Sequence, residues 1–259
     1  MLAVTPASVR ADVGVFGGSG FYSLLDHLEA VPLDTPYGPP SDPPMVGDVG
    51  GRRVAFIARH GEDHRHPAHV VNYRANAWAM AALGVRAVVA PFACGSLRRE
   101  LAPGDVVVVD QQVDRTHSRA GTFFDGPETV HLPFADPYDA ELGAVLAEVA
   151  TEQGRTVHVG GTVVVIPGPR FSTRAESRDF VRCGWDLVNM TQAPEAALCV
   201  EAGLRYVGLG LVTDYDAGLE DDPDHPPVTM EQVFAVLRAN AAAVRDLVVA
   251  AVDRFDLDG

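Results

Sequence analysis

Short apolar runs rich in valine and isoleucine alternate along the chain with longer stretches whose apolar residues recur at helical spacing. Continuous apolar runs favour buried strands, and a helical period favours helices that cover a sheet. Strands are predicted at 12–16, 52–58, 85–91, 105–110, 161–166, 187–190 and 205–212, and helices at 71–83, 138–153, 174–183, 194–202 and 230–253. This alternation predicts an α/β fold with a mixed, largely parallel central β-sheet flanked by helices on both faces.

The ends of the predicted helices carry matching signals. Thr173-x-x-Glu176 and Thr229-x-x-Gln232 are typical capping boxes at two helix starts. A glycine follows each of the first four helices, at the position where helices favour a left-handed residue. These glycines are Gly84, Gly154, Gly184 and Gly203. Since no repeat or linker divides the chain, we expect residues 1–259 to form a single domain with its core at about 12–250.

Composition and charge exclude several classes of protein. The formal net charge of −15 disfavours nucleic-acid binding, which needs clustered Lys and Arg. No apolar run approaches the ~18 residues of a membrane span, and the first residues lack the basic and apolar regions of a signal peptide. Cys94, Cys183 and Cys199 are widely separated, which predicts buried thiols in a reducing compartment. We therefore expect a cytoplasmic protein that binds neither nucleic acid nor membrane.

The first candidate for ligand binding is the glycine turn in "VGVFGGSGFY", residues 13–22. Glycines after a strand let the backbone approach a phosphate group closely. The dinucleotide fingerprint G-x-G-x-x-G is absent, because its third glycine, counted from Gly18, would fall on Ser23. The turn therefore indicates a phosphate site of another kind.

Three further stretches are unlike a scaffold, namely 59–69, 118–130 and 214–227. Each follows a strand or a sheet edge, where open α/β sheets usually bind ligands. Arg59 and His60 come directly after a predicted strand. A guanidinium and an imidazole at such a position can form an anion clamp, or they can belong to an ordinary polar loop.

The same stretch permits a metal site. The spacing His64-x-His66-x-x-His69 resembles the ligand spacing of metal-dependent hydrolases. No other cluster of His and Asp at ligand spacing supports it. We therefore expect no metal, and keep a metal-dependent deaminase as an alternative.

Two loops of the second half carry further candidates. In "IPGPRFSTRAES", Phe171 follows a rigid Pro-Gly-Pro bend and either stacks on a flat ligand or fills the core. In "LVNMTQAPE", Asn189 and Thr191 interrupt a buried strand before Pro194 begins a helix. A hydroxyl and backbone N–H groups at such a junction favour either an anion or a simple capping turn.

Two carboxylates end the last predicted strand, in "GLVTDYDAG". If the strand geometry continues, Asp214 and Asp216 point to one side and Tyr215 to the other. Neighbouring carboxylates raise each other's pKa, and a dry site raises it further. The pair therefore suits a proton donor and an acceptor of N–H groups, or else a solvated acidic loop or a divalent-metal site.

Taken together, these stretches resemble the trimeric purine nucleoside phosphorylases, and most closely their 5′-methylthioadenosine phosphorylase branch. The likeness runs in order through "GVFGGSGF", "DTPYGPPSD", "ARHGEDH…VNYRAN", "ACGSL…PGDVVVVDQ…DRT", "GPRFSTRAE", "VNMTQAPE" and "LVTDYDAG". No single motif decides it, but seven motifs in the same order do. The resemblance implies that the glycine turn binds inorganic phosphate.

The resemblance also assigns roles by position. It implies phosphate binding by Ser19, Arg59, His60, Ala93 and Thr191. It implies nucleoside binding by Phe92, Phe171, Met190, Asp214, Asp216, His64, Met230 and His131. Phe92 departs from the pattern, because relatives often have Thr there, and only its backbone N–H remains. Asp214 and Asp216 correspond to the pair that binds N7 and the 6-position of the purine, and His131 to a residue that reaches a neighbouring subunit's site.

The reaction implied is phosphorolysis of a purine nucleoside, most closely 5′-methylthioadenosine or another 6-aminopurine nucleoside, by a homotrimer. Such a reaction builds an oxocarbenium-like sugar, protonates the leaving purine and uses bound phosphate as nucleophile. It needs no metal or organic cofactor, because phosphate is a co-substrate. The alternatives are a phosphorylase that accepts 6-oxopurines, a nucleosidase that uses water, and a nucleoside-binding module without activity.

Overall fold

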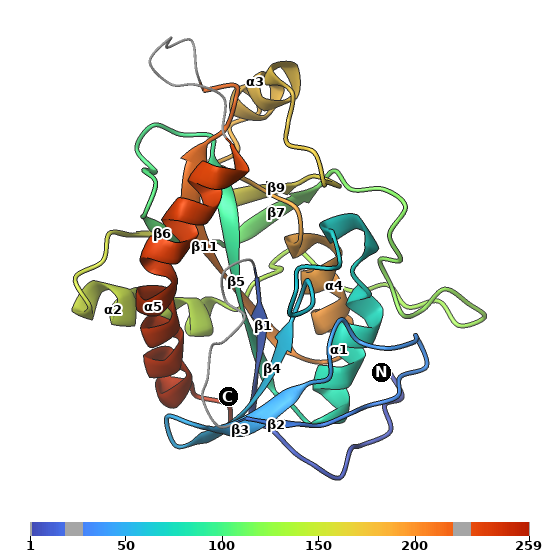
Figure 1. Ribbon diagram of the computed structural model, residues 1–259. Coiled ribbons are helices and arrows are strands. Elements are labelled where there is room, and N and C mark those ends of the chain that lie inside the picture. The colour runs from blue at the N-terminus through green and yellow to red at the C-terminus, as the bar shows by residue number, and fades with distance from the viewer. Residues whose placement is uncertain (1, 19–27, 220–228, 259) are drawn as a thin grey trace.

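A mixed β-sheet forms the centre of the protein, here in a computed structural model (Figure 1). The structure describes residues 2–18, 28–219 and 229–258. Within these residues the strands are β1 (Val13–Gly17), β2 (Glu29–Ala30), β3 (Met45–Val49), β4 (Arg52–Ala58), β5 (Ala87–Ser96), β6 (Val106–Val108), β7 (Gln111–Asp114), β8 (Val157–Val159), β9 (Thr162–Val165), β10 (Leu187–Asn189) and β11 (Arg205–Tyr215). The helices are η1 (Ala68–Val70), α1 (Tyr73–Ala82), α2 (Ala140–Glu152), α3 (Arg174–Arg182), α4 (Gln192–Glu201) and α5 (Met230–Arg254).

The strand pairing confirms the predicted fold class. β1 lies between β4 and β5 and is parallel to both. β11 is parallel to β5, β9 to both β7 and β10, and β8 to β6. Antiparallel pairs join β3 to β2 and β4, β10 to β5, and β6 to β11. The sheet is therefore mixed and largely parallel.

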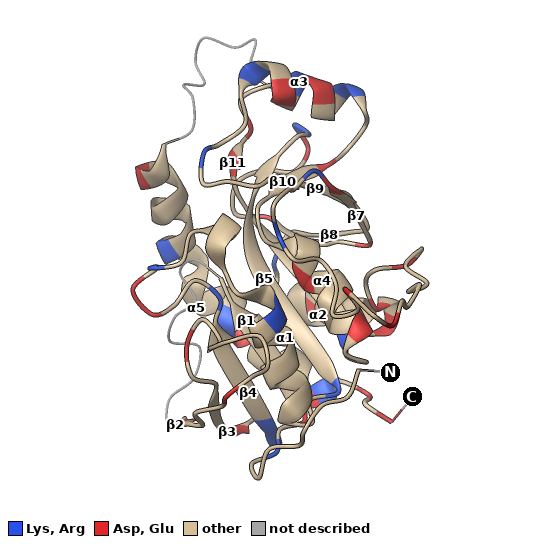
Figure 2. Ribbon diagram, turned by 90° about the vertical axis from the view of Figure 1, so that its right-hand side faces the viewer, with Lys and Arg blue, Asp and Glu red and all other residues tan. Residues whose placement is uncertain are grey.

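Helices cover both faces of this sheet, as predicted (Figure 1). α1 packs against α4 on one face, and α2 packs against α5 on the other. Each face has its own apolar cluster, which includes Ala77 and Leu198 on the first and Leu146 and Leu247 on the second. The central strands β1 and β5 carry no charged side chain (Figure 2), as their double-sided burial requires.

All seven predicted strands and all five predicted helices are present within a few residues of their expected bounds. The sequence pattern missed β2, β3, β7 and β8. Residues of these strands are partly exposed, so they form no continuous apolar run. Both capping boxes are confirmed at Thr173 and Thr229. The four glycines after the helices all have positive φ, between 70° and 79°.

Two expectations drawn from composition have different outcomes. Cys94 and Cys199 are buried, but Cys183 is exposed, so the prediction of three buried thiols is wrong at that position. The reason is local, since Cys183 caps the end of α3, a helix that buries only Ser177 and Phe180. No helix in the described part of the chain is long and apolar enough to cross a membrane.

The sheet opens beside the second half of β5. β1 follows β5 only as far as Val89, and β10 joins the same edge only at Gly95. Residues 90–94 thus have no strand partner on this edge among the described residues. The Pro91 carbonyl faces the gap and accepts a hydrogen bond from Arg59 Nη1 at 3.3 Å. Since N and C=O of one strand residue point the same way, proline's missing N–H breaks no ladder bond there, and β5 continues past the predicted end at 91.

Candidate active site

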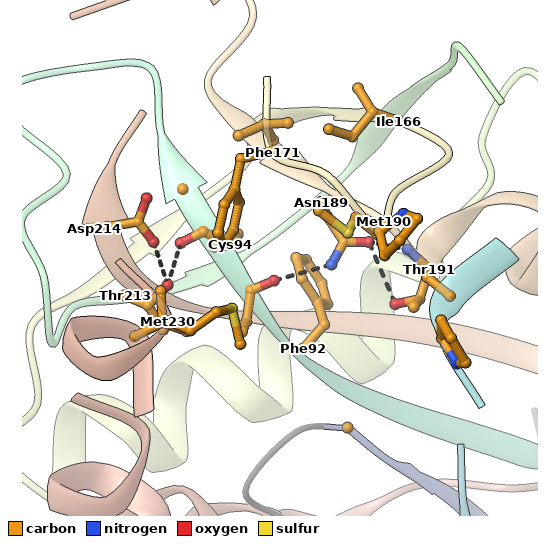
Figure 3. A pocket seen from close by; sticks show the side chains of 18 of the residues that line it. Phe92, Cys94, Ile166, Phe171, Asn189, Met190, Thr191, Thr213, Asp214 and Met230 are labelled. Atoms are coloured by element: carbon orange, nitrogen blue, oxygen red, sulfur yellow. Dashed lines mark hydrogen bonds between the residues drawn. The ribbon is translucent and has the colours of Figure 1, made fainter. Parts of the chain in front are cut away.

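A cavity of about 410 Å³ occupies this opening in the sheet. Its walls come from the second half of β5, the β10–α4 junction, the end of β11, the loops 59–68 and 166–172, and the start of α5 (Figure 3). Carboxyl ends of parallel strands meet here, which is where α/β sheets place their ligands. The volume suits a small organic ligand.

The cavity collects nearly all the residues singled out from the sequence. Arg59, His60, His64, Phe92, Ala93, Phe171, Met190, Thr191, Asp214, Asp216 and Met230 all line it. Ser19 lies outside the described residues. His131 is exposed and does not line this cavity. Segments more than 150 residues apart in the chain thus form one site.

At one end of the cavity, Arg59 is fully buried and paired with a carboxylate. Its Nε lies 2.5 Å from Glu195 Oε2 and its Nη2 2.8 Å from Oε1. The Tyr206 hydroxyl donates to the same Oε1 at 2.8 Å. The Glu195 carboxylate raises the pKa of Arg59 against the opposing effect of burial, so the guanidinium stays charged. Gly18 lies against it, because a Cβ there would be 2.9 Å from Nη1.

His60 lies beside Arg59 and is held in one tautomer. Its Nδ1 is 2.8 Å from the His66 carbonyl, which can only accept, so Nδ1 carries the hydrogen and Nε2 is left as an acceptor. Burial and the neighbouring Arg59 charge lower the pKa of His60 to about 3. The ring stacks on His64 at 4.5 Å between centroids. The imidazole is therefore neutral at physiological pH.

Asn189 connects β5 to the start of α4. Its Nδ2 donates to the Ala93 carbonyl at 2.9 Å. Its Oδ1 accepts from the backbone N–H groups of Thr191 and Gln192 at 2.6 and 2.9 Å, and from the Thr191 hydroxyl at 3.3 Å. The capping interpretation of this junction is thus confirmed for Asn189. The same amide thus joins the backbone of Ala93 to the backbone of Thr191, and both residues line the cavity.

The opposite end of the cavity is acidic. Asp214 and Asp216 both line it, while the Tyr215 hydroxyl turns away to the Arg99 carbonyl at 3.2 Å, as the strand alternation predicts. Asp216 is 3% exposed, and its Oδ2 has no hydrogen-bond partner among the described residues. Burial raises the pKa of the Asp216 carboxyl, against the lowering effect of the Ser177 and Ser172 hydroxyls.

Asp214 belongs to a short polar chain. The Thr213 hydroxyl lies 2.6 Å from Asp214 Oδ1 and 3.2 Å from the Cys94 carbonyl. One hydroxyl hydrogen serves only one of these two acceptors. The Thr213 hydroxyl thus places the Asp214 side chain beside the backbone of β5.

Between the two ends the walls are apolar. Phe92, Ile166, Phe171, Val188 and Met190 contribute to them. The Met190 sulfur packs against the Pro-Gly-Pro bend, where a Cβ on Gly168 would lie only 2.6 Å away and where φ is +65°. The positive φ favours glycine at this position. A flat apolar ring fits between such walls.

The three histidines of the alternative metal site do not form one. Among the described residues, which include His64, His66 and His69, no group of three or more His, Cys, Asp or Glu side chains could hold a metal ion. His60 and His64 stack face to face instead. The geometry gives the deaminase alternative no support.

Comparison with known proteins decides the family. Residues 12–253 match the model of the Phosphorylase superfamily. A purine nucleoside phosphorylase of Streptomyces coelicolor is 48% identical over 97% of this chain and 91% of its own. The chain belongs to the phosphorylase superfamily. An S-methyl-5′-thioadenosine phosphorylase of Mycobacterium tuberculosis is 50% identical over 93% of this chain and 89% of its own.

A solved structure of the superfamily has the same fold. The methylthioadenosine phosphorylase of Schistosoma mansoni in complex with adenine superposes with a TM-score of 0.90, at 35% identity, over 95% of this chain and 93% of that chain. The resemblance inferred from the seven motifs is thereby confirmed for the family and for its methylthioadenosine phosphorylase branch.

Sequence reasoning missed three residues of this phosphorylase site. Glu195 had a signal, because a lone acid inside the apolar stretch after Pro194 indicates a buried, paired charge. Ser172 had none, although it lines the cavity and its hydroxyl lowers the pKa of Asp216. Thr213 also lines the cavity and had none, because a threonine in a buried strand is ordinary.

Proposed function

We propose that this protein is a purine nucleoside phosphorylase that cleaves 5′-methylthioadenosine or related 6-aminopurine nucleosides with inorganic phosphate. The observation that carries the proposal is Asp216 Oδ2, a buried carboxylate oxygen at one end of the cavity that has no hydrogen-bond partner among the described residues. Buried polar atoms without partners are rare in proteins, and a bound ligand is one way to supply the missing hydrogen bond. A carboxylate acceptor suits the 6-amino group of adenine, which is a donor.

The other end of the cavity supports phosphate as the second substrate. Arg59 Nη1, the backbone N–H groups at Ala93 and the Thr191 hydroxyl are candidate donors for its oxygens. His60 offers an acceptor at Nε2, which suits hydrogen phosphate, because this ion carries one proton at neutral pH. Ser19 is the further proposed donor, by resemblance. The Arg59 charge is offset by Glu195, so the N–H and O–H donors supply much of the binding.

The arrangement of the residues in the cavity gives each of them a role in the reaction. A phosphate oxygen attacks C1′ while the bond from C1′ to N9 of the purine breaks, and the electron pair leaves with the base. Asp214, in its protonated form, donates a proton toward N7, and Asp216 accepts a hydrogen bond from the 6-amino group. Phe171 lies against the base and Met190 under the ribose. The phosphate both forms the new bond and stabilises the cationic sugar.

We further infer a homotrimer in which His131 of a neighbouring subunit completes the site near the 5′-substituent. In this subunit His131 is exposed and outside the cavity, whereas His64 and the half-exposed Met230 line its rim. A residue that serves a neighbour's site must be exposed in the isolated chain. The rim that carries His64 and Met230 is the side left for the 5′-substituent.

The test is base release from 5′-methylthioadenosine, adenosine and inosine, with and without phosphate. Release should require phosphate, yield the 1-phosphate of the sugar, and favour both 6-amino substrates over inosine. Equal release in phosphate-free buffer would identify a nucleosidase. Adenosine binding without release in saturating phosphate would identify a binding module. A preference for inosine would favour a broad purine nucleoside phosphorylase. This is the second candidate function, because the Streptomyces coelicolor relative is named a purine nucleoside phosphorylase.

A further inference from the structure

Arg119, in the stretch 118–130, forms hydrogen bonds with the backbone of two segments that line the cavity. Arg119 Nη1 donates to the Met190 carbonyl at 2.8 Å and to the Ala193 carbonyl at 2.6 Å. Its Nη2 donates to the Pro167 carbonyl at 2.7 Å. Arg119 itself does not line the cavity. Its contacts are therefore with the backbone that carries the site, and not with the space a ligand would occupy.

The three carbonyls belong to two segments with different ligands. Met190–Ala193, called here the phosphate segment, contains Thr191 between the two carbonyls that Arg119 binds. Pro167–Ser172, called here the base loop, contains Phe171 and Ser172. A planar guanidinium offers donors in a fixed fork, so it sets the distance between the backbone atoms it bridges. Arg119 thus fixes the spacing between the phosphate end and the base end.

A third wall is tied to the same side chain. The Arg119 guanidinium lies 5.3 Å from the centroid of the Tyr73 ring. The Tyr73 hydroxyl donates to the carbonyl of Ala68, a residue that lines the cavity. Stacking on an aromatic face adds to the rigidity of the fork.

The charge of Arg119 is also unusual for this site. Arg59 is paired with Glu195, and His60 is neutral. In the part of the chain that the structure describes, no carboxylate forms an ion pair with Arg119, whose partners are carbonyl oxygens. Arg119 thus brings an unpaired positive charge to the Met190 carbonyl, in the residue before Thr191. This charge favours an anion that binds at Thr191.

We propose that Arg119 is a positioning residue for phosphorolysis, and that its fork, in addition to its charge, holds the phosphate segment at the correct distance from the base loop. This inference rests on the function proposed above. A displacement of about 1 Å between reacting groups costs on the order of 100-fold in rate. Replacement by lysine keeps the charge but offers a single ammonium in place of a planar fork.

The experiment compares Arg119→Lys with Arg115→Lys. Arg115, four residues before Arg119, is the control, because its guanidinium also lies 5.3 Å from an aromatic ring, that of Trp185, but its side chain joins no two cavity walls among the described residues. For each variant, kcat, the KM values for phosphate and nucleoside, and the thermal midpoint are measured. Arg119→Lys should lower kcat 10- to 100-fold, with a smaller rise in either KM, and Arg115→Lys should stay within about twofold of wild type.

The outcomes separate positioning from a purely structural role. A fall in thermal midpoint with unchanged kcat per folded molecule would show that Arg119 only stabilises the fold. Unchanged kcat and stability would overturn the inference altogether. If Arg119→Lys does not fold, Arg119→Gln, which keeps a planar group with N–H donors, takes its place with the same expected loss.

A binding measurement keeps this inference distinguishable from the proposed function. If the wild type released no base with phosphate, the proposed function would fail, and calorimetry with adenine alone would still test Arg119. Adenine should bind about tenfold more weakly to Arg119→Lys than to Arg115→Lys, because the base loop loses its tie at Pro167. Equal adenine affinity in the two variants would refute the role of the fork.

Discussion

The Arg59 guanidinium and the Glu195 carboxylate lie in a doubly hydrogen-bonded pair, with Nε 2.5 Å from Oε2 and Nη2 2.8 Å from Oε1. Both side chains are buried, at 1% and 2% exposed. Nη1, which Glu195 does not engage, donates to the Pro91 carbonyl beside the cavity. The pair therefore holds the guanidinium at the cavity and offsets its charge there.

The Arg59–Glu195 pair predicts that substitutions can change the stability of the protein and its phosphate binding independently. Arg59→Met should lower the free energy of unfolding by about 3–5 kcal/mol, because it leaves the buried Glu195 carboxylate unpaired. It should also raise the apparent KM for phosphate far more than the KM for the nucleoside. The double variant Arg59→Met/Glu195→Leu should recover much of the stability, because neither charge remains buried, but not the phosphate KM. Urea unfolding and steady-state kinetics measure the two effects, and recovery of the phosphate KM in the double variant would contradict the assignment of Arg59.

His60 predicts a loss of stability in mild acid. The pKa of His60 is about 3 in the folded protein and 6.5 in the unfolded chain. Below pH 6.5 the imidazole is therefore protonated in the unfolded chain while it stays neutral in the folded protein. The stability contribution is present above pH 6.5 and is lost as the pH falls toward 3. At about 1.4 kcal/mol per pKa unit, the loss between pH 7 and pH 5 is about 2 kcal/mol.

The measurement is urea unfolding at pH 7 and pH 5 at one protein concentration. His60→Asn, whose amide can still donate to the His66 carbonyl, should lose about 2 kcal/mol less than the wild type over this interval. His117→Asn, at an exposed histidine, is the control and should behave as the wild type. Parallel pH profiles for wild type and His60→Asn would show that His60 is not buried in the neutral form.

Asp214 and Asp216 predict a preference for 6-aminopurines. An ionised carboxylate that faces a 6-oxo group leaves a buried polar mismatch of about 1–3 kcal/mol. The wild type should therefore favour adenosine over inosine by about ten- to a hundredfold in kcat/KM. Asp214→Asn supplies an amide donor, so the ratio should move toward inosine while adenine release slows for lack of the proton donor. Inosine activity should also improve relative to adenosine as the pH falls, and a wild type that already prefers inosine at pH 7 would refute the assignment of the pair.

The proposed shared site predicts a trimer. Light scattering should give a mass near three times 27.5 kDa. His131→Ala should reduce kcat/KM for 5′-substituted nucleosides about tenfold or more, with little change in the phosphate KM. Mixing His131→Ala with Arg59→Met subunits should give back activity, because some sites then combine an intact His131 with an intact Arg59. A fully active monomer, or no recovery in mixed trimers, would exclude the shared site.

Much of this architecture follows from local patterns. Alternating valine-rich runs and amphipathic stretches predicted all seven strands and all five helices named from the sequence, because burial on a sheet and on a helix face imposes different periods. Capping at Thr173 and Thr229 and the glycines after the helices were equally predictable, since each needs only a few consecutive residues. The strands β2, β3, β7 and β8 were not, because partly exposed strands carry no continuous apolar signal.

For the site, the sequence by itself determined which residues have the right chemistry, and the tertiary structure decided how they are paired. Arg59, Thr191 and Asp214 could be selected from the sequence, because each is a polar residue that follows a buried strand, where α/β sheets bind their ligands. Only the folded chain shows that Arg59 is bound to Glu195, 136 residues away, and that Arg119 joins Pro167 to Met190. Such pairings depend on the gap beside residues 90–94 of β5, where the partner strand changes from β1 to β10. The physical reason is that a strand's pattern records whether it is buried, but not which strand lies beside it.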